Sequence, residues 1–391
     1  MTGPADRWLA EHGAELVRAR RWLHAHPELG RQEHATTAWL CERLSAAGLQ
    51  PRALAGGTGV VCDVGSGDGP VVVLRADIDA LPLPDEKDVS YRSTVPGVCH
   101  ACGHDVHTAV LLGTGLALAQ VAGELRGTVR LLFQHAEELM PGGALDVLAE
   151  GLLDDVSSAF ALHCDPALEV GRVGLKSGPI TAASDDLKVH LTGPGGHTSR
   201  PHNTVDLVHA LSTVATGLPD ALSRLVDPRA GLCLVWGHVS AGRAPNAIPR
   251  EGLLHGTLRL LDKDAWHGAP DMVHRVVDQL VAPYGARAQV TYSRGVPPVV
   301  NDPSATALMT AAVRSALGAG SAVPTAQSLG GEDFAWCLEQ VPGALGRLGV
   351  KAPGRASSYD LHQGSFDVDE EALPAGVRVM TAVALAALSA G

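Results

Sequence analysis

The residues with the clearest chemical potential are concentrated in the segment CHACGHDVHTA, residues 99–109. Cys102 and His104 are two positions apart, so on an extended segment their side chains would point to the same side. A thiolate and an imidazole are both good ligands for a borderline ion such as zinc. Short Cys-x-His pairs also arise by chance, so this pair needs support from other parts of the chain.

Two adjacent carboxylates, Glu137 and Glu138, follow the apolar run TVRLLFQ. Neighbouring residues in a strand face opposite ways, so these carboxylates can converge only if the chain leaves the strand there. A Pro-Gly-Gly break at 141–143 permits such a turn. A solvated acidic turn before a helix is the alternative interpretation of the same residues.

Chemically useful side chains also lie at the ends of two further apolar strands. Asp77 and Asp79 lie near the end of VVVLRADIDA, and His163 lies at the end of SAFALHC. In open α/β sheets, sites form at the carboxyl ends of strands. Four successive strands are therefore expected to deliver Asp, Cys and His, Glu and His to one edge of one sheet. Buried carboxylates are costly unless they are paired or near a cation, so this coincidence favours a metal site.

The elements that would position these residues alternate between helix and strand. Apolar residues recur at helical spacing over 7–24 and 35–47. Four apolar strands follow, GVVCDVG, VVVLRADIDALPL, TVRLLFQHAEE and SAFALHC, with helical patterns at 107–122 and 143–153 between the last three. Continuous apolar strands separated by helices predict an α/β fold with a mixed, largely parallel sheet and helices on both faces.

The pattern changes from about residue 184. Residues 184–296 follow the order βαββαβ, which predicts a ferredoxin-like domain inserted into the larger one. Residues 1–183 and 297–391 then form the two parts of the larger, catalytic domain, and further helices are predicted at 303–317, 332–340 and 370–388.

The composition narrows the functional classes. The 391 residues suggest two domains, and a hydrophobic content of 46% suffices for a buried core. A formal net charge of -12 disfavours nucleic acid as a partner. The N-terminal residues lack a basic region before an apolar run, and no uncharged apolar stretch of about 18 residues occurs, so neither a secretory signal nor a membrane span is expected. The seven scattered cysteines are expected to be reduced, in a cytoplasmic protein.

A series of motifs runs through nearly the whole chain in a fixed order. They are RRWLHAHPELGRQEHATT (20–37), LRADIDALP (74–82), HACGHDVHTA (100–109), QHAEE (134–138), ALHCDP (161–166), GPGGHTSRPH (193–202), APNAIP (244–249), GTLR (256–259), GGEDF (330–334) and DLHQGSFDVDEE (360–371). Together they resemble the family of aminoacylases, hippurate hydrolases, plant auxin-conjugate hydrolases and related carboxypeptidases, which are co-catalytic two-metal peptidases with a zinc-peptidase-like catalytic domain.

This resemblance implies roles for individual residues. The implied ligands of two divalent ions are Cys102, His104, Glu138, His163 and His362. Glu137 is implied as the general base, and Asp79 as the residue that orients a ligand or the base. The substrate contacts implied on the inserted domain are His197, which is also assigned to catalysis, Asn246 and Arg259. Four further residues match the family pattern and are expected to be structural or to support the ligands. They are His24, Glu33, Asp105 and His107.

The implied reaction is hydrolysis of the amide bond of an N-acyl amino acid, or of a similar small amide or dipeptide. Two ions about 3.5–4 Å apart can hold a bridging hydroxide, which Glu137 would generate from water. A metal and His197 would stabilise the oxyanion, and the guanidinium of Arg259 suits a substrate carboxylate. Zinc is the first candidate ion, followed by manganese, cobalt and nickel. The resemblance also implies a homodimer through the inserted domain.

Three positions depart from the family pattern, and two other functions remain open. His135 and Gly364 stand where the family usually has proline, and Gly331 stands where it often has serine. A metal-independent cysteine amidase would use Cys102 as its nucleophile. A non-enzymatic relative would bind conjugates or peptides without cleaving them.

Overall fold

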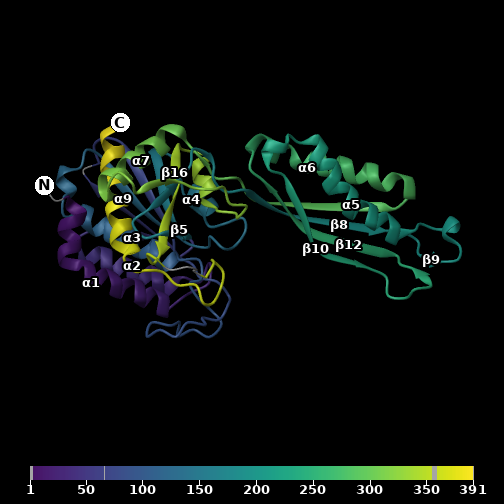
Figure 1. Ribbon diagram of the computed structural model, residues 1–391, viewed down its shortest axis with the longest axis horizontal. Coiled ribbons are helices and arrows are strands. Elements are labelled where there is room, and N and C mark those ends of the chain that lie inside the picture. The colour runs from purple at the N-terminus through teal and green to yellow at the C-terminus, as the bar shows by residue number, and fades with distance from the viewer. Residues whose placement is uncertain (1–2, 66, 355–358, 391) are drawn as a thin grey trace. The chain divides into compact units, whose positions relative to one another are not determined.

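The computed structural model describes residues 3–65, 67–354 and 359–390, and the chain forms two compact units (Figure 1). The first unit comprises Met1–Gly178, Val300–Ala326 and Asp333–Gly391. The second comprises Pro179–Val299 and Gln327–Glu332. The boundaries expected from the sequence, 184 and 296, lie inside the second unit.

The first unit is built on an eight-stranded sheet with the order β1-β2-β4-β3-β5-β16-β6-β15. Its strands are β1 (Arg52–Ala53), β2 (Val60–Gly65), β3 (Val71–Asp77), β4 (Thr128–Gln134), β5 (Val156–Glu169), β6 (Val173–Leu175), β15 (Ala322–Pro324) and β16 (Gly343–Lys351). The central strands β4, β3, β5 and β16 are parallel, whereas β1, β2 and β6 make antiparallel pairings. The predicted mixed, largely parallel sheet is confirmed.

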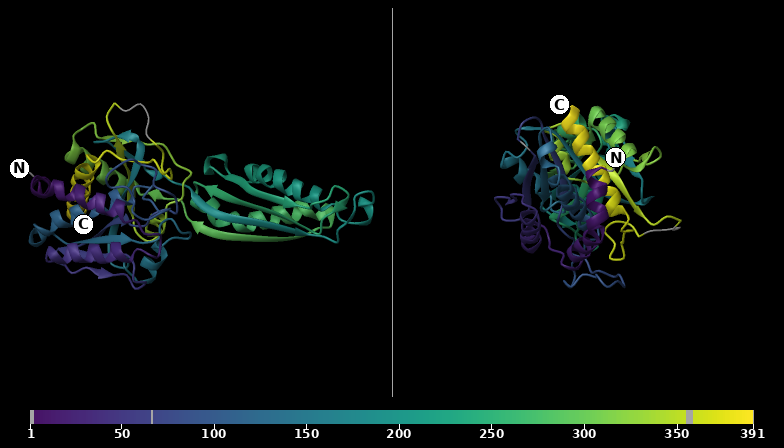
Figure 2. Two further views of the ribbon diagram at one scale, coloured as in Figure 1. Left: turned by 90° about the horizontal axis from the view of Figure 1, so that it is seen from below. Right: turned by 90° about the vertical axis from the view of Figure 1, so that its left-hand side faces the viewer.

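Helices cover both faces of this sheet. They are α1 (Pro4–Ala25), α2 (His34–Ala46), α3 (His104–Ala119), α4 (Ala144–Ala149), α7 (Pro303–Leu317), α8 (Phe334–Leu338) and α9 (Ala372–Ala390). The helices α1, α2, α3, α7 and α9 are linked by mutual contacts into one layer, and α4 and α8 contact each other. Figure 2 shows the layered arrangement of helices and sheet from two further sides. The core between sheet and helices is mainly Leu, Val and Ala, because the chain contains few aromatic residues.

The C-terminal helix α9 is long and apolar enough, by length and composition, to cross a membrane. No membrane-spanning segment was expected from the sequence. In the structure α9 packs against α1, α3 and α7, and most of its side chains are buried. These contacts are those of a core helix, and they explain the apolar composition.

The second unit has its own four-stranded antiparallel sheet, with the order β10-β12-β8-β13. Its elements are β8 (Ala183–Thr192), α5 (Leu207–Leu225), β10 (Cys233–Ala241), β12 (Glu251–Leu260), α6 (Lys263–Val281) and β13 (Arg287–Val296). Buried residues alternate along β8 and β12 and include Leu187, Leu254 and Leu258, so only one sheet face carries the apolar core beneath α5 and α6. Beyond the ends of β8 and β12, the short strands β9 (Gly196–His197) and β11 (Ala247–Ile248) pair with each other (Figure 1).

Candidate metal centre

The predicted metal ligands of the first unit come together with Asp77 beside three central strands of the sheet, and His163 lies within β5, which continues to Glu169, and not at a strand end as expected. Asp77 is the last residue of β3, the Glu137–Glu138 pair follows β4, and His163 lies on β5. Cys102 and His104 do not follow a strand of their own, so the expectation of four contributing strands was wrong. They come from the segment that leads into α3, which begins at His104.

Glycine 103 determines how Cys102 and His104 are presented. Its φ of 87° is left-handed, and it forms the N-cap of α3. The two side chains therefore converge across a turn into a helix, and not along the extended segment expected from the sequence. A Cβ on Gly103 would lie 2.7 Å from Cys164 Sγ, so both the conformation and the close approach require glycine.

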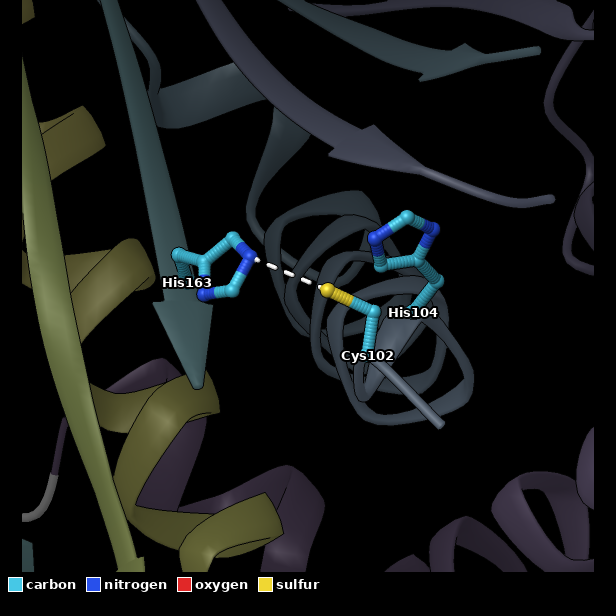
Figure 3. Close-up of side chains that lie close together, drawn as sticks. All are labelled: Cys102, His104 and His163. Carbon is cyan, nitrogen blue, oxygen red and sulfur yellow. Dashed lines mark hydrogen bonds between the residues drawn. The ribbon is translucent and has the colours of Figure 1, made fainter. Parts of the chain in front are cut away.

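Three donors meet at Cys102 in one candidate ligand group. Cys102, His104 and His163 place one ligand atom each within 4.8 Å of one another, and Cys102 Sγ lies 3.5 Å from His163 Nε2 (Figure 3). Nδ1 of His163 lies 2.9 Å from the carbonyl oxygen of Cys164. Because a carbonyl can only accept, Nδ1 donates there, and the lone pair of Nε2 is directed at the sulfur.

A second group shares the same sulfur. Cys102, Glu138 and His362 are also within 4.8 Å of one another, and His362 Nε2 lies 3.3 Å from Glu138 Oε1. The His362 backbone is left-handed, with a φ of 61°, and its N–H donates to the carbonyl of Ala101 at 2.8 Å. His104, Glu137 and Glu138 form a third overlapping group. The other four expected ligands thus surround the Cys102 thiol, with Glu137 beside them.

Asp79 connects two of these groups. His104 Nδ1 lies 2.9 Å from the Asp79 carbonyl and 3.2 Å from its Oδ1, so Nδ1 donates and Nε2 faces the other ligands. The other carboxylate oxygen, Oδ2, accepts the backbone N–H of Glu138 at 2.9 Å. One buried carboxylate therefore orients both an imidazole and the turn that carries the acidic pair.

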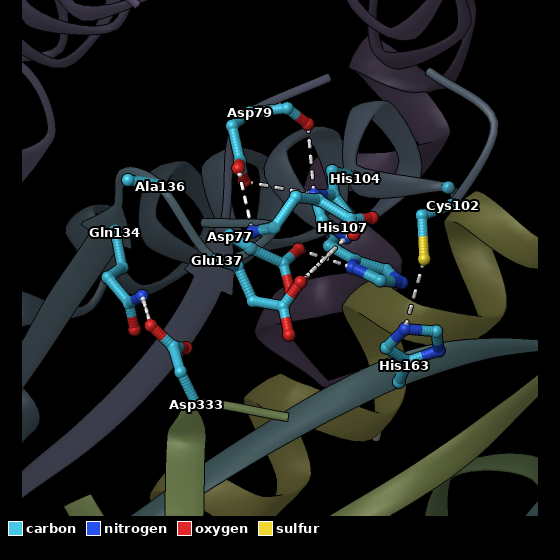
Figure 4. A network of polar contacts seen from close by, with 12 residues as sticks. Asp77, Asp79, Cys102, His104, His107, Gln134, Ala136, Glu137, His163 and Asp333 are labelled. Atoms are coloured by element: carbon cyan, nitrogen blue, oxygen red, sulfur yellow. Dashed lines mark hydrogen bonds and ion pairs between the residues drawn. The ribbon is translucent and has the colours of Figure 1, made fainter. Parts of the chain in front are cut away.

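A buried polar network behind the ligands was not identified from the sequence. Arg75 donates to Asp77 and to Asp333, each at 2.7 Å. Gln134 Nε2 donates to Asp333 at 2.6 Å (Figure 4). Asp77 in turn contacts His107 Nδ1 at 2.5 Å. These residues join β3, β4 and the start of α8 beneath the site. Only Asp77 and His107 among them were singled out from the sequence, since an arginine inside an apolar strand gives no signal of its partners.

The remaining residues that match the family pattern lie around the centre. His24 contacts Asp105 at 2.7 Å and Asp85 at 3.2 Å, and both of its ring nitrogens are engaged. His107 Nε2 accepts the backbone N–H of Cys164 at 2.8 Å. His135, which departs from that pattern, turns its ring to Asp146, with Nε2 2.9 Å from the carboxylate.

The charges around the centre fit a neutral His163 imidazole and a bound cation. Burial, with His107 and Arg347 nearby, holds the pKa of His163 well below its usual value, so this ring stays neutral. Burial opposes ionisation of Asp77, but His104, His107 and Arg75 outweigh it and keep the pKa of this carboxyl well below its usual range. The Cys102 thiol has its pKa raised by burial, so its thiolate form needs a positive charge beside it.

His104 Nε2 provides a direct test of whether the residues suit metal ions. The atom is buried and has no hydrogen-bond partner among the residues that the structure describes. Carboxylate oxygens of Asp77, Glu137 and Glu138 lie at 3.8 to 3.9 Å, too far for hydrogen bonds. A buried lone pair facing acidic groups across such a gap fits a bound cation.

The residues expected to contact substrate lie on the second unit. His197 is in β9. The residue after it, Thr198, donates its N–H to the carbonyl of Asn246 at 3.4 Å, so His197 and Asn246 lie close together. Arg259 is on β12 opposite Ser184, whereas Glu251 at the other end of β12 is opposite Thr192. Arg259 Nη1 donates to the carbonyl of Leu329. Arg259 is thus separated from His197 and Asn246 by the length of β12.

The model of peptidase family M20/M25/M40 matches residues 73–386. The chain belongs to this family. A solved structure of the Bacillus subtilis YxeP protein, described as a dinuclear metal-binding peptidase of family M20, has a TM-score of 0.85 and 34% sequence identity, covering 96% of this chain and 98% of that one. The N-acyl-L-amino acid amidohydrolase of Geobacillus stearothermophilus is 38% identical over 296 residues, 75% of this chain and 80% of that protein.

A longer relative is similar over nearly the whole chain. A Rhodococcus jostii (strain RHA1) protein, provisionally named glutamate–cysteine ligase 2-3, is 48% identical over 369 residues, which make up 94% of this chain and 46% of that protein. The chain therefore spans about half the length of that relative. The M20/M25/M40 match and the clustered donors identify the chain as a metallo-amidohydrolase and support a centre of two metal ions.

Proposed function

We propose that this M20/M25/M40 family member hydrolyses the amide bond of an N-acyl amino acid or a similarly small amide. The observation that carries the proposal is the meeting of Cys102, His104, Glu138, His163 and His362 in overlapping groups around one sulfur, with Glu137 beside them. Two divalent ions held there would lower the pKa of a bound water and polarise the amide carbonyl. Zinc suits the thiolate and imidazole donors best, and manganese, cobalt or nickel suit the carboxylate.

Glu137 is the general base in this proposal. Its side chain is largely buried, and one carboxylate oxygen lies 3.9 Å from His104 Nε2, within reach of a water at the centre. Glu137 takes a proton from that water and later gives it to the leaving amine. Asp79 keeps His104 and the Glu138 backbone in place while this happens.

The N-acyl amino acid is proposed from two kinds of support. The similarity to an N-acyl-L-amino acid amidohydrolase points to this substrate class. Arg259 uses one nitrogen for the Leu329 carbonyl, and the rest of its planar fork of donors suits a substrate carboxylate. His197 would donate to the oxyanion, and Asn246 lies next to it.

We further infer a homodimer in which His197 serves the partner's centre. Arg259 and Glu251 are eight residues apart along β12, or about 27 Å at the usual rise per residue, and β9 extends further. One small substrate cannot touch both His197 and Arg259 of the same unit over that distance. The edge strand β10 exposes Val235 and Val239, which suits pairing with a second copy.

Two other features bear on where and how the enzyme acts. All seven cysteines are free thiols, which suits the reducing cytoplasm that we propose. The contact between Cys102 and His163 would also suit a thiol nucleophile. A cysteine amidase, however, has no use for Glu138 and His362 around the same sulfur, and a purely binding relative has no use for Glu137.

Chelation of the purified enzyme tests this function. We expect EDTA or phenanthroline to abolish hydrolysis of an N-acyl amino acid from a panel with acetyl, benzoyl, long-chain and indole-acetyl groups. Zinc, manganese, cobalt or nickel, added singly, should restore it. Turnover that survives complete metal removal would favour the cysteine mechanism. Metal-replete enzyme that cleaves no member of the panel would contradict the substrate class.

A further inference from the structure

Glu33 is a buried carboxylate that contacts the turn carrying the proposed general base. It immediately precedes α2 and is 0% exposed. Its Oε1 accepts the backbone N–H of Ala136 at 2.8 Å. Its own carbonyl accepts both the N–H and the hydroxyl of Thr37, at 2.9 and 2.6 Å, so the backbone of Glu33 is fixed to α2.

Ala136 is the point in the turn where such support is needed. Its φ of 54° is left-handed, a conformation that residues with a Cβ rarely adopt. Ala136 is 0% exposed, so without Glu33 its N–H would be buried and unpaired. The Ala136 carbonyl accepts the N–H of Gly143 at 3.0 Å, which closes the turn from the other side.

We propose that Glu33 is a positioning residue. It fixes the direction of the Glu137 carboxylate by binding the backbone N–H of the preceding residue, Ala136. The peptide behind Glu137 is held in the same way, since the N–H of Glu138 donates to Asp79. The base is thus flanked by two backbone donors, each bound to a buried carboxylate. This inference rests on the proposed role of Glu137 as general base.

The environment of Glu33 shows which substitutions distinguish this role. Burial raises the pKa of Glu33, and a single oxygen of its carboxylate, Oε1, accepts the Ala136 N–H. The contact needs an oxygen at the end of a side chain of this length. Gln supplies such an oxygen, whereas Asp keeps the charge but is one methylene too short, and Ala removes the acceptor.

Glu28 offers a matched control on the same segment. Its carboxylate also accepts backbone N–H groups, those of Ala35 at 2.9 Å and Thr36 at 2.8 Å, at the start of α2. Its side chain has no contact with the 134–138 turn among the hydrogen bonds of the described residues. Glu28→Ala therefore weakens the same helix without releasing Ala136.

The experiment compares Glu33→Ala, Glu33→Asp, Glu33→Gln and Glu28→Ala as metal-loaded enzymes. Turnover of an N-acyl amino acid, bound metal and hydrogen–deuterium exchange of a peptide spanning 134–138 are measured for each. We expect Glu33→Ala and Glu33→Asp to lose about 10- to 100-fold in kcat with KM little changed, because a small misplacement of a reacting group has effects of that order. Both should keep their metal and exchange faster at 134–138, whereas Glu33→Gln and Glu28→Ala should behave like wild type.

Three results would overturn the proposal. They are wild-type kcat and exchange in the Ala or Asp variant, a loss in Glu33→Gln as large as in Glu33→Ala, or the same loss in Glu28→Ala. If Glu33→Ala does not fold, the contrast between Asp and Gln decides. Exchange is measured without turnover, so it tests Glu33 even if wild-type enzyme cleaves no N-acyl amino acid, an outcome that would count against the proposed function alone.

Discussion

The two units hold their candidate functional residues in opposite ways. In the first, the side chains proposed to bind metal come from four separate segments; three of the five are buried, and the two buried imidazoles are each oriented by a hydrogen bond through Nδ1. In the second, His197 and Asn246 are exposed at the short β9–β11 strand pair beyond the sheet, at the opposite end of β12 from Arg259. The first unit therefore presents a nearly finished centre, and the second presents donors that need a substrate or another subunit to complete them.

This difference shows what each unit contributes energetically. Orientation of a ligand such as His104 by Asp79 is settled during folding, so the centre loses little freedom when an ion or substrate binds. An exposed donor such as His197 loses its freedom only on binding. Its ring is held by Ser199 alone among the hydrogen bonds of the described residues, with contacts at 3.1 and 2.9 Å. We therefore expect substitutions in the two units to separate chemistry from assembly.

The largest effect is expected from Glu137→Gln. The amide cannot act as a base, so kcat should fall by roughly 100- to 10,000-fold. The metal content should stay at the wild-type level, because none of the five proposed ligands is changed. Steady-state kinetics and elemental analysis of the same preparation check both parts. Near-normal turnover in metal-replete protein would show that another group is the base.

Glu138→Ala and His163→Ala provide the contrast to that variant. Each removes a proposed ligand, so bound metal should fall together with activity. Unchanged metal stoichiometry in either one would remove that residue from the ligand set.

A smaller effect is expected from His197→Ala, and it tests the second unit. Loss of one oxyanion donor typically lowers kcat by about 100- to 1,000-fold, and the metal should be retained. If His197 acts on the partner's centre, co-expression with Glu137→Gln should recover about a quarter of wild-type activity, because half of the dimers are mixed and each has one intact site. No recovery in demonstrably mixed dimers would place His197 on its own chain's centre. Wild-type rates in His197→Ala alone would show that His197 takes no part in catalysis.

Much of the first unit's fold could be predicted because its signals are local. The helix predicted at 303–317 coincides with α7, where Asp302 caps the N-terminus and Pro303 begins the helix. The helix predicted at 107–122 instead begins at His104, because the left-handed Gly103 sets its start and not an apolar repeat. The segment Gln327–Glu332 was assigned to the larger domain, yet Arg259 and Ile180 hold it in the second unit through Leu329 and Ser328.

Only two signals in the sequence located residues of the site: the ends of the predicted strands and the family resemblance. Asp77, Glu138 and His163 could be placed at one sheet edge because parallel strands end together. His362 could not, because its loop has no periodicity and its left-handed φ leaves no mark in the sequence. The pairing of Arg75 with Asp333 joins residues 258 positions apart, which only tertiary packing establishes.

The smallest effect is expected from substitution of Asp185, a buried carboxylate of the second unit. This residue stabilises the fold and takes no part in the proposed reaction, so its loss should affect stability and not turnover. Asp185 accepts hydrogen bonds from Trp266 Nε1 at 2.8 Å, Tyr292 Oη at 2.5 Å and the Gly295 N–H at 2.9 Å. Asp185→Asn replaces one acceptor oxygen by a donor, and a buried donor left unpaired costs about 1–3 kcal/mol of unfolding free energy. Urea unfolding followed by tryptophan fluorescence measures the loss, while metal content stays unchanged.

The adjacent Asp186 lies on the open sheet face, half-buried beside His255, so Asp186→Asn should cost less unfolding free energy than Asp185→Asn. Equal losses in the two variants would mean that burial does not distinguish these carboxylates.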